Sequence, residues 1–268
     1  MIKKFLIDYP IAAALEAGKA ILNIYNSTND IEVVHKADDS PLTKADQAAN
    51  DVINRYLTQT EYPIISEENK QIPYEVRKNW DSCWIVDPLD GTKEFIKKNG
   101  EFTVNIAFCK NGKPTFGVIY VPVSRELYYG DVDSGMAFKT MVSSEHTLVT
   151  PLFMSSDRLQ PANSPSTSLK LVGSRSHMNP ETEAFINKMQ NQFEKIEIVS
   201  KGSSLKFCMV AEGKAHMYPR FAPTMEWDTA AGSAIVEALG LKVTTGNTEE
   251  PLVYNKENLL NPYFLVSM

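Results

Sequence analysis

With 268 residues, the chain is long enough to form one large or two moderate domains around a sizeable hydrophobic core. Its hydrophobic content of 43% and charged content of 22% are those of an ordinary globular protein, and no stretch has the length and apolarity of a membrane span. The formal net charge of -6 argues against nucleic acid as a partner, because there is no basic surplus to neutralise phosphates.

The three cysteines and four histidines show no spacing typical of a metal site or a disulfide framework. We therefore expect Cys83, Cys109 and Cys208 to be buried free thiols in a reducing compartment, which predicts a cytoplasmic protein. Asp8 and Pro10 interrupt the opening apolar residues too early for an export signal. The sequence leaves open a peripheral association with the inner membrane, and it leaves open a monomer or a homodimer.

The first half of the chain predicts a helix pair followed by an antiparallel meander. Apolar residues recur at helical spacing in two segments, and shorter apolar runs predict strands between and after them. A hairpin turn is predicted at Asn111-Gly112. Pro88 and Gly91 predict that the chain leaves the preceding strand in a turn. The predicted helices are 2–25 and one from Asp46 to about Thr58, and the predicted strands are 31–34, 62–66, 83–86, 102–108, 115–121, 127–129 and 136–138.

The second half of the chain predicts a more regular alternation of strands and helices. A segment rich in proline and serine, 151–168, is the favoured boundary between the halves. We therefore expect an N-terminal α+β domain, 1–155, that carries metal-binding motifs, and a C-terminal α/β domain, 156–268, that completes the site and the substrate pocket. The predicted strands here are 169–172, 196–199 and 215–218, and the predicted helices are 180–193, 205–212 and 226–239.

Acidic residues stand at the ends of predicted strands and at the starts of predicted helices. Asp87 and Asp90 follow one apolar strand, Glu67 follows another, and Asp46 and Asp228 stand at helix starts. Taken singly, each acid is explained as an ordinary cap or loop residue, and for Asp46 that is the better explanation. Taken together, a cluster of Mg²⁺ ions accounts for all of them at once, because Mg²⁺ prefers carboxylate, carbonyl and hydroxyl oxygens.

Three motifs in the same order and at matching separations resemble the inositol monophosphatase superfamily, and the resemblance extends over essentially the whole chain. These motifs are Glu67-Glu68, Asp87-Pro88-Leu89-Asp90-Gly91-Thr92 and Trp227-Asp228-Thr229-Ala230-Ala231-Gly232. Within the superfamily the chain is most similar to the 3'(2'),5'-bisphosphate nucleotidases. That narrower resemblance rests on Gly173-Ser174-Arg175-Ser176-His177, Gly202-Ser203-Ser204-Leu205-Lys206 and Tyr218-Pro219-Arg220.

The resemblance implies a layered αβαβα sugar-phosphatase fold and a magnesium-dependent, lithium-sensitive phosphatase with two or three Mg²⁺ ions. The implied reaction removes the 3' or 2' phosphate of adenosine 3'(2'),5'-bisphosphate to give AMP, and the sulfated form of this nucleotide is a further implied substrate. This activity would place the protein in sulfur assimilation and nucleotide recycling. The implied partner is therefore a phosphorylated nucleotide of low molecular weight.

The resemblance also implies roles for individual residues. Glu67, Asp87 and the carbonyl of Leu89 would hold one ion, and Asp90 and Asp228 would hold a second ion that Asp87 bridges to the first. Asp46, Thr92 and Glu67 would act in catalysis by orienting and deprotonating the attacking water. The implied substrate-binding residues are Gly91, Thr92, Ser174, Arg175, His177, Ser203, Lys206, Arg220 and Asp228.

Three other interpretations are weighed against this one. A haloacid-dehalogenase phosphatase also uses an Asp-rich turn after a strand, but it spaces its acids by two residues, whereas Asp87 and Asp90 are three apart. Another branch of the same superfamily would act on inositol monophosphate or fructose bisphosphate. An inactive metal- or nucleotide-binding regulator is disfavoured, because an unused carboxylate cluster destabilises a fold through repulsion.

Overall fold

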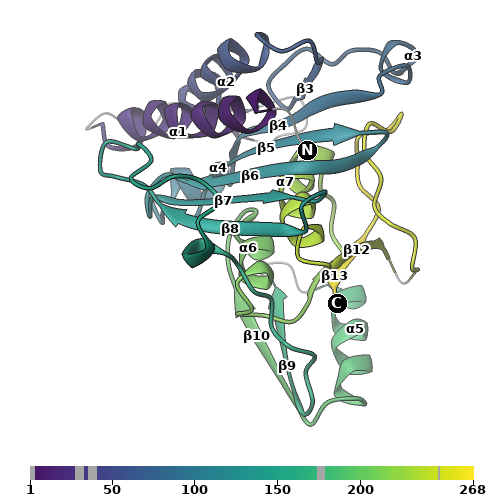
Figure 1. Cartoon of the computed structure of the whole chain (residues 1–268). Coiled ribbons are helices and arrows are strands. Elements are labelled where there is room, and N and C mark those ends of the chain that lie inside the picture. The colour runs from purple at the N-terminus through teal and green to yellow at the C-terminus, as the bar shows by residue number, and fades with distance from the viewer. Residues whose placement is uncertain (1–3, 28–32, 36–40, 174–178, 247) are drawn as a thin grey trace.

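The computed structural model describes residues 4–27, 33–35, 41–173, 179–246 and 248–268, which stack in alternating layers of helix and sheet. Figure 1 shows α1 and α2 on one face of the large sheet, with α6 and α7 on its other face. Beyond α6 and α7 lie the smaller strands, and α5 covers them from outside. The predicted layered αβαβα fold is therefore confirmed. None of the helices in these described ranges combines the length and apolarity that crossing a membrane requires.

The large sheet has six strands in the order β3-β4-β5-β6-β7-β8. β3 runs parallel to β4, and every other neighbouring pair is antiparallel, so the predicted meander is confirmed. The hairpin between β5 and β6 turns through Asn111 (φ 50°) and Gly112 (φ 72°), the conformation predicted for this dipeptide. The strands are β3 Ile64–Ser66, β4 Ser82–Asp90, β5 Thr103–Lys110, β6 Lys113–Val121, β7 Glu126–Asp131 and β8 Met136–Met141.

The predicted turn at Pro88 is wrong, because β4 continues through Pro88 to Asp90. The register against β5 shifts between Asp87 and Asp90, which places one extra residue in β4 as a bulge. β3 already ends opposite Val86, so Pro88 has a neighbouring strand on one side only. A bulge beside a sheet edge tolerates a residue without an N–H group. The chain reverses at Gly91 instead, where φ is 96°.

Two helices form the outer layer as the apolar spacing predicts. α1 covers Phe5–Tyr25 and α2 covers Lys44–Leu57. α2 begins with a capping box, in which the Ala45 amide donates to Thr43 Oγ1 at 3.1 Å and the Thr43 amide donates to Asp46 Oδ2 at 2.8 Å. The short elements of this half that the sequence did not predict are β2 Pro41–Thr43, which pairs with β1 Val33–His35, and the helices α3 Tyr74–Arg77 and α4 Thr92–Ile96.

The second half contains a parallel strand pair and a separate three-stranded sheet of order β11-β13-β12. The strand predicted at 215–218 is displaced, because Met217 forms only an isolated bridge to Leu171 and regular pairing starts at Tyr218. The strands β12 and β13 and the 3₁₀ helix η1 were not predicted. The elements are η1 Ser155–Asp157, β9 Ser168–Gly173, α5 Pro180–Gln190, β10 Lys195–Ser200, α6 Leu205–Ala211, β11 Tyr218–Arg220, α7 Glu226–Glu237, β12 Lys242–Thr245 and β13 Phe264–Ser267.

One hydrophobic cluster joins the large sheet to α6 and α7, and it contains residues from both sides of the predicted boundary at 155, such as Ile119 and Ile235. The division into 1–155 and 156–268 stays our proposal for how the chain is organised. The three cysteines lie in this cluster as buried free thiols, as predicted.

α7 lies directly against the sheet because two strand glycines leave room for its backbone. A Cβ atom added at Gly117 would lie 2.3 Å from the carbonyl oxygen of Ala231 and 2.8 Å from Cβ of Ala234. A Cβ atom added at Gly130 would lie 2.8 Å from Cα of Ile235. The backbone of α7, the helix that carries Asp228, therefore packs directly on these strand glycines.

We expect Gly117→Ala to destabilise the protein, because the added methyl group meets helix backbone that no rotamer change can move aside. Overpacking of this kind costs about 3 kcal/mol, which corresponds to a Tm lower by roughly 5–10 °C for a chain of this size. Thermal unfolding measures the effect. Gly173→Ala is the matched control, since an added Cβ there meets only a side-chain methyl of Ile198 at 3.2 Å. Equal Tm values for Gly117→Ala and wild type would contradict the backbone contact.

Candidate active site

Two acids meet at one edge of the large sheet because β3 runs parallel to β4 and ends beside Val86. Ser66 pairs with Val86, so the next residues along each chain are Glu67 and Asp87. The Glu67 amide donates to the Val86 carbonyl at 3.2 Å, which fixes the position of the first acid beside the second. The predicted convergence of acids at strand ends is therefore present.

The bulge in β4 and the reversal at Gly91 position the second part of the motif. Asp87 is buried, and its Oδ1 accepts a hydrogen bond from the Leu89 amide at 3.0 Å. Only glycine suits position 91, because φ is positive there and an added Cβ would meet the Glu101 carbonyl at 3.1 Å and Ser203 Cβ at 3.2 Å. This close approach brings the 202–204 loop against the acidic turn.

Thr92 begins α4 and faces the start of α2. Its Oγ1 donates to Asp46 Oδ1 at 3.3 Å and lies 3.5 Å from the Leu89 carbonyl oxygen. This contact joins two of the residues that the resemblance implied to act on the attacking water. Asp46 also accepts from the Thr43 hydroxyl at 2.6 Å and the Thr43 amide at 2.8 Å, so its carboxylate serves the α2 cap and Thr92 together.

Asp228 comes to the same place from the first turn of α7. Its Oδ2 accepts from the Met225 amide at 2.8 Å, which holds the carboxylate over the helix start. Asp90 is held from the 202–204 loop, because its Oδ2 accepts from the Ser204 amide and the Ser204 hydroxyl, each at 2.6 Å. Segments far apart in the sequence therefore supply the acidic cluster, which consists of Asp46, Glu67, Asp87, Asp90 and Asp228.

Mutual repulsion and burial raise the pKa values of three carboxylates in this cluster. Burial, followed by the charges of Glu67, Asp90 and Asp228, raises the pKa of Asp87 well above its ordinary value. Burial and the neighbouring Asp90 raise the pKa of Asp228 to about 8. Burial also raises the pKa of Asp46, against the lowering effect of its Thr43 hydrogen bonds. Such shifts are typical of carboxylates that a cation would stabilise.

The donor set fits Mg²⁺ in its chemistry. Asp87, Asp90 and Asp228 each use one carboxylate oxygen to accept from a protein donor, and their other oxygen accepts no hydrogen bond within the described residues. Hard carboxylate oxygens, with a carbonyl and a hydroxyl nearby, are the ligands Mg²⁺ prefers. Among the residues that the structure describes, no group of three or more His, Cys, Asp or Glu side chains is placed so that it could hold a metal ion as it stands. The fit therefore rests on the type, the charge and the free oxygens of these donors.

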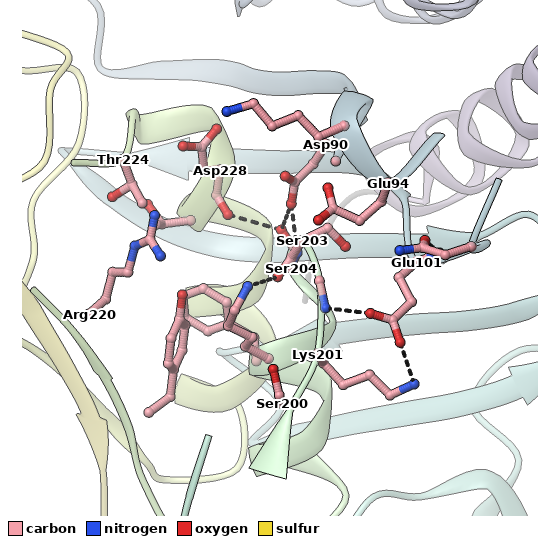
Figure 2. A pocket seen from close by; sticks show the side chains of 18 residues that line it. Asp90, Glu94, Glu101, Ser200, Lys201, Ser203, Ser204, Arg220, Thr224 and Asp228 are labelled. Carbon is pink, nitrogen blue, oxygen red and sulfur yellow. Dashed lines mark hydrogen bonds and ion pairs between the residues drawn. The ribbon is translucent and has the colours of Figure 1, made fainter. Parts of the chain in front are cut away.

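Two adjoining cavities open at the cluster. The first has a volume of about 750 Å³ and contains Glu67, Asp87, Leu89 and Thr92 in its wall. The second has a volume of about 420 Å³ and is shown in Figure 2. The walls of both cavities share six residues, so the two spaces meet at the acids. The shared residues are Asp90, Gly91, Lys93, Glu94, Thr224 and Asp228.

The second cavity carries basic groups opposite the acids. Lys206 is only 8% exposed, and its Nζ donates to the Ser203 carbonyl at 3.0 Å and lies over the ring of Tyr218. Burial lowers its pKa, while Asp90 raises it. Arg220 Nη2 donates to the Pro223 carbonyl at 3.3 Å. Arg220 Nε and Ser203 Oγ are buried without a hydrogen-bond partner in the described part of the chain, so each has a hydrogen-bonding capacity that no described protein group uses.

The structure brings most of the predicted site residues together. Gly91, Thr92, Ser203, Lys206 and Arg220 border the cavities that hold the acids. Three predicted substrate-binding residues, Ser174, Arg175 and His177, lie outside the described residues, so their roles stay predictions.

The sequence did not point to Glu101, although this residue fixes the loop that borders the second cavity. Glu101 Oε2 accepts from the Gly202 amide at 2.8 Å, and its Oε1 accepts from Lys201 at 3.0 Å, as Figure 2 shows. An isolated acid before a strand carries no local signal for such a contact, because its partners are a hundred residues away.

Comparisons with known proteins agree with this geometry. The model of the inositol monophosphatase family matches residues 4–263. The 3'(2'),5'-bisphosphate nucleotidase CysQ of Shigella flexneri is 43% identical over 266 residues, which are 98% of this chain and 100% of that protein. The protein of the same name from Escherichia coli K12 is 43% identical over 267 residues, with the same coverage.

Solved structures with a similar fold agree with these sequence comparisons. The crystal structure of CysQ from Bacteroides thetaiotaomicron, a bacterial member of the inositol monophosphatase family, is 50% identical, covers 98% of each chain and has a TM-score of 0.85. The extragenic suppressor protein suhB from Bartonella henselae is 23% identical, covers 97% of this chain and 93% of its own, and has a TM-score of 0.73. The second likeness concerns the fold alone.

Proposed function

The chain belongs to the inositol monophosphatase family, and from this premise we propose that it is a magnesium-dependent 3'(2'),5'-bisphosphate nucleotidase. The reaction removes the 3' or 2' phosphate of adenosine 3'(2'),5'-bisphosphate and leaves AMP. The observation that carries this proposal is the pair of adjoining cavities, of which one is lined by most of the acidic cluster and the other adds Lys201, Lys206 and Arg220, which suits a substrate with two separate phosphates. The near full-length likeness to proteins called 3'(2'),5'-bisphosphate nucleotidase supports the same choice.

The acidic cavity takes the phosphate that is removed. Glu67, Asp87, the Leu89 carbonyl, Asp90 and Asp228 would hold two or three Mg²⁺ ions there. When bound, Mg²⁺ supplies positive charge to the phosphoryl oxygens and to the leaving oxygen. Without a cation these carboxylates repel a phosphate, which explains why an acidic protein of this kind depends on the metal.

Thr92 and Asp46 act on the attacking water. The Thr92 hydroxyl donates to Asp46 Oδ1, so the lone pairs on Thr92 Oγ1 remain free to accept a hydrogen bond from water. Asp46 has a raised pKa, which suits a carboxylate that takes up a proton through Thr92 as the water attacks phosphorus. The water attacks the phosphate directly, and no covalent bond to the enzyme forms.

The second cavity takes the phosphate that stays on the nucleotide. Lys206 Nζ and the Arg220 guanidinium would donate to it. Lys206 is held among protein groups and is not a solvated surface charge, so an anion that pairs with it gains a charge-assisted bond in a dry environment. An inositol monophosphate has no second phosphate and would leave these groups unpaired.

Phosphate release in the presence of Mg²⁺ tests the proposal. Wild-type protein should hydrolyse adenosine 3',5'-bisphosphate with a higher kcat/KM than inositol 1-phosphate, and a chelator should abolish both activities. The reverse preference would move the protein to another branch of the family. The proposal includes a cytoplasmic location, which the three buried free thiols favour.

We expect Lys206→Met to impair hydrolysis only of a substrate that carries the second phosphate. Met keeps the buried stem of the side chain and removes only the ammonium group. For adenosine 3',5'-bisphosphate, kcat/KM should fall about 10- to 100-fold, the effect of losing a hydrogen bond to a charged group. Adenosine 3'-monophosphate, which lacks the second phosphate, is the matched control and should be hydrolysed almost as by wild type. An equal loss on both substrates would mean that Lys206 supports the fold or the acidic cluster instead.

A further inference from the structure

Two polar side chains are fully buried in β5, a strand that is otherwise mostly apolar. Thr103 is 0% exposed and Asn105 is 1% exposed. Burying a polar group is unfavourable unless it is hydrogen-bonded, so the contacts of these residues indicate their purpose. The Thr103 hydroxyl donates to Asn105 Oδ1 at 3.0 Å. This contact fixes the amide, so that Nδ2 points toward the acidic cluster.

Hydrogen bonds connect Asn105 Nδ2 to Ser204 and Ser204 to Asp90. Nδ2 donates to Ser204 Oγ at 2.8 Å and lies 3.4 Å from Asp90 Oδ2. A serine hydroxyl has one proton, and the bond accepted from Asn105 leaves that proton free for another acceptor. Asp90 Oδ2 lies 2.6 Å from Ser204 Oγ, while the Asp228 carbonyl oxygen lies at 3.0 Å. The shorter distance and the negative charge both favour Asp90.

Ser204 does not use its hydroxyl for the task that its position in the chain suggests. It is the N-cap residue of α6, where a serine usually accepts from a helix amide. No side-chain cap bond is present there. Both the amide and the hydroxyl of Ser204 are turned to the same oxygen of Asp90 (Figure 2). α6 therefore lacks a side-chain cap, and the Asp90 carboxylate accepts two hydrogen bonds from Ser204.

We infer that Ser204, held by Asn105, is a positioning residue that orients the Asp90 carboxylate for the cation. With Oδ2 fixed by Ser204, the rotation of the carboxylate is set and Oδ1 is presented to the acidic cavity. This inference rests on the proposed Mg²⁺ site. It goes beyond that proposal because it assigns the orientation of Asp90 to a chain of Thr103, Asn105 and Ser204. Groups that orient a metal ligand typically affect metal affinity by 10- to 100-fold.

Mg²⁺ binding in the absence of substrate tests the inference. Titration calorimetry with MgCl₂ should give a Kd about 10- to 100-fold higher for Ser204→Ala than for wild type. Ser204→Thr keeps the hydroxyl and should restore the affinity to within a few-fold. Ser233→Ala is the matched control, because Ser233 is equally buried but its hydroxyl pairs with Tyr254 at 2.6 Å. This control should lose thermal stability without a change in Mg²⁺ affinity.

Wild-type Mg²⁺ affinity in a folded Ser204→Ala protein would overturn the inference. If Ser204→Ala fails to fold, Thr103→Val decides the question, since it frees the Asn105 amide to rotate and removes no atom from Ser204. We expect its Mg²⁺ affinity to fall several-fold, and an unchanged affinity would refute the inference. Wild-type protein that binds Mg²⁺ but does not hydrolyse the bisphosphate would refute the proposed function alone. Wild-type protein that binds no Mg²⁺ would refute both.

Discussion

Asp90→Asn is expected to lower kcat for adenosine 3',5'-bisphosphate by at least ~10²-fold while the protein stays folded, because the change removes a charge that stabilises the metal and through it the transition state. The asparagine keeps an oxygen that can accept from the Ser204 amide, so the 202–204 loop keeps its anchor. Steady-state phosphate release at saturating Mg²⁺ measures the loss. Circular dichroism confirms that the variant is folded.

A buried aspartate outside the cluster gives the matched control for this substitution. Asp131 is 7% exposed, accepts from the Asp133 amide at 3.1 Å and lines neither cavity. Asp131→Asn removes a buried carboxylate charge in the same way and should leave kcat close to the wild-type value. Near-normal turnover in a folded Asp90→Asn protein would contradict the assignment of Asp90 to the metal site.

Much of the acidic cluster could be predicted from sequence because each acid stands next to a local signal. Glu67 and Asp87 each follow an apolar run, and β3 runs parallel to β4, so their meeting follows from strand order. The Asn111-Gly112 hairpin is likewise a two-residue signal. These features depend on a few neighbouring residues, although a signal of the same kind gave the incorrect turn at Pro88.

Contacts between segments far apart in the sequence could not be predicted from local signals. Asn105 and Ser204 are separated by 99 positions, and neither has a neighbour that indicates the other. Lysine is almost never fully buried, so the burial of Lys206 could not be expected from sequence, and it comes from packing against the Tyr218 ring and the 202–204 loop. The four-residue strands β12 and β13 are too short to show a clear alternation, and their pairing depends on residues that are about twenty positions apart.

The stability of the protein without Mg²⁺ should fall as the pH rises from about 4 to 8. The folded-state pKa of Asp228 is about 8, against an ordinary value of 3.8. Between these values the folded state binds more protons than the unfolded state, so raising the pH favours unfolding. Between pH 3.8 and pH 7, ionisation of Asp228 alone lowers the free energy of unfolding by on the order of 4 kcal/mol, at 1.36 kcal/mol for each pH unit. Asp87 adds to the effect in the same direction.

Mg²⁺ should reverse this dependence, because a bound cation stabilises the ionised carboxylates and must compete with protons for them. The gap in Tm between Mg²⁺ and chelator should therefore be small near pH 5 and widen toward pH 8. Glu237, whose pKa burial raises to about 7, titrates in the same window. It lines neither cavity, so it should affect the curves with and without Mg²⁺ alike and cancel in their difference.

Asp228→Asn isolates one carboxylate of the acidic cluster. The asparagine oxygen can still accept from the Met225 amide, so the start of α7 keeps its cap. In chelator this variant should be more stable than wild type at pH 8 and should show a smaller decline between pH 5 and 8. In Mg²⁺ it should lose most of the stabilisation that wild type gains. A chelator curve for wild type that is flat from pH 5 to 8, or a decline that Asp228→Asn leaves unchanged, would show that repulsion within the acidic cluster does not limit the stability of the metal-free protein.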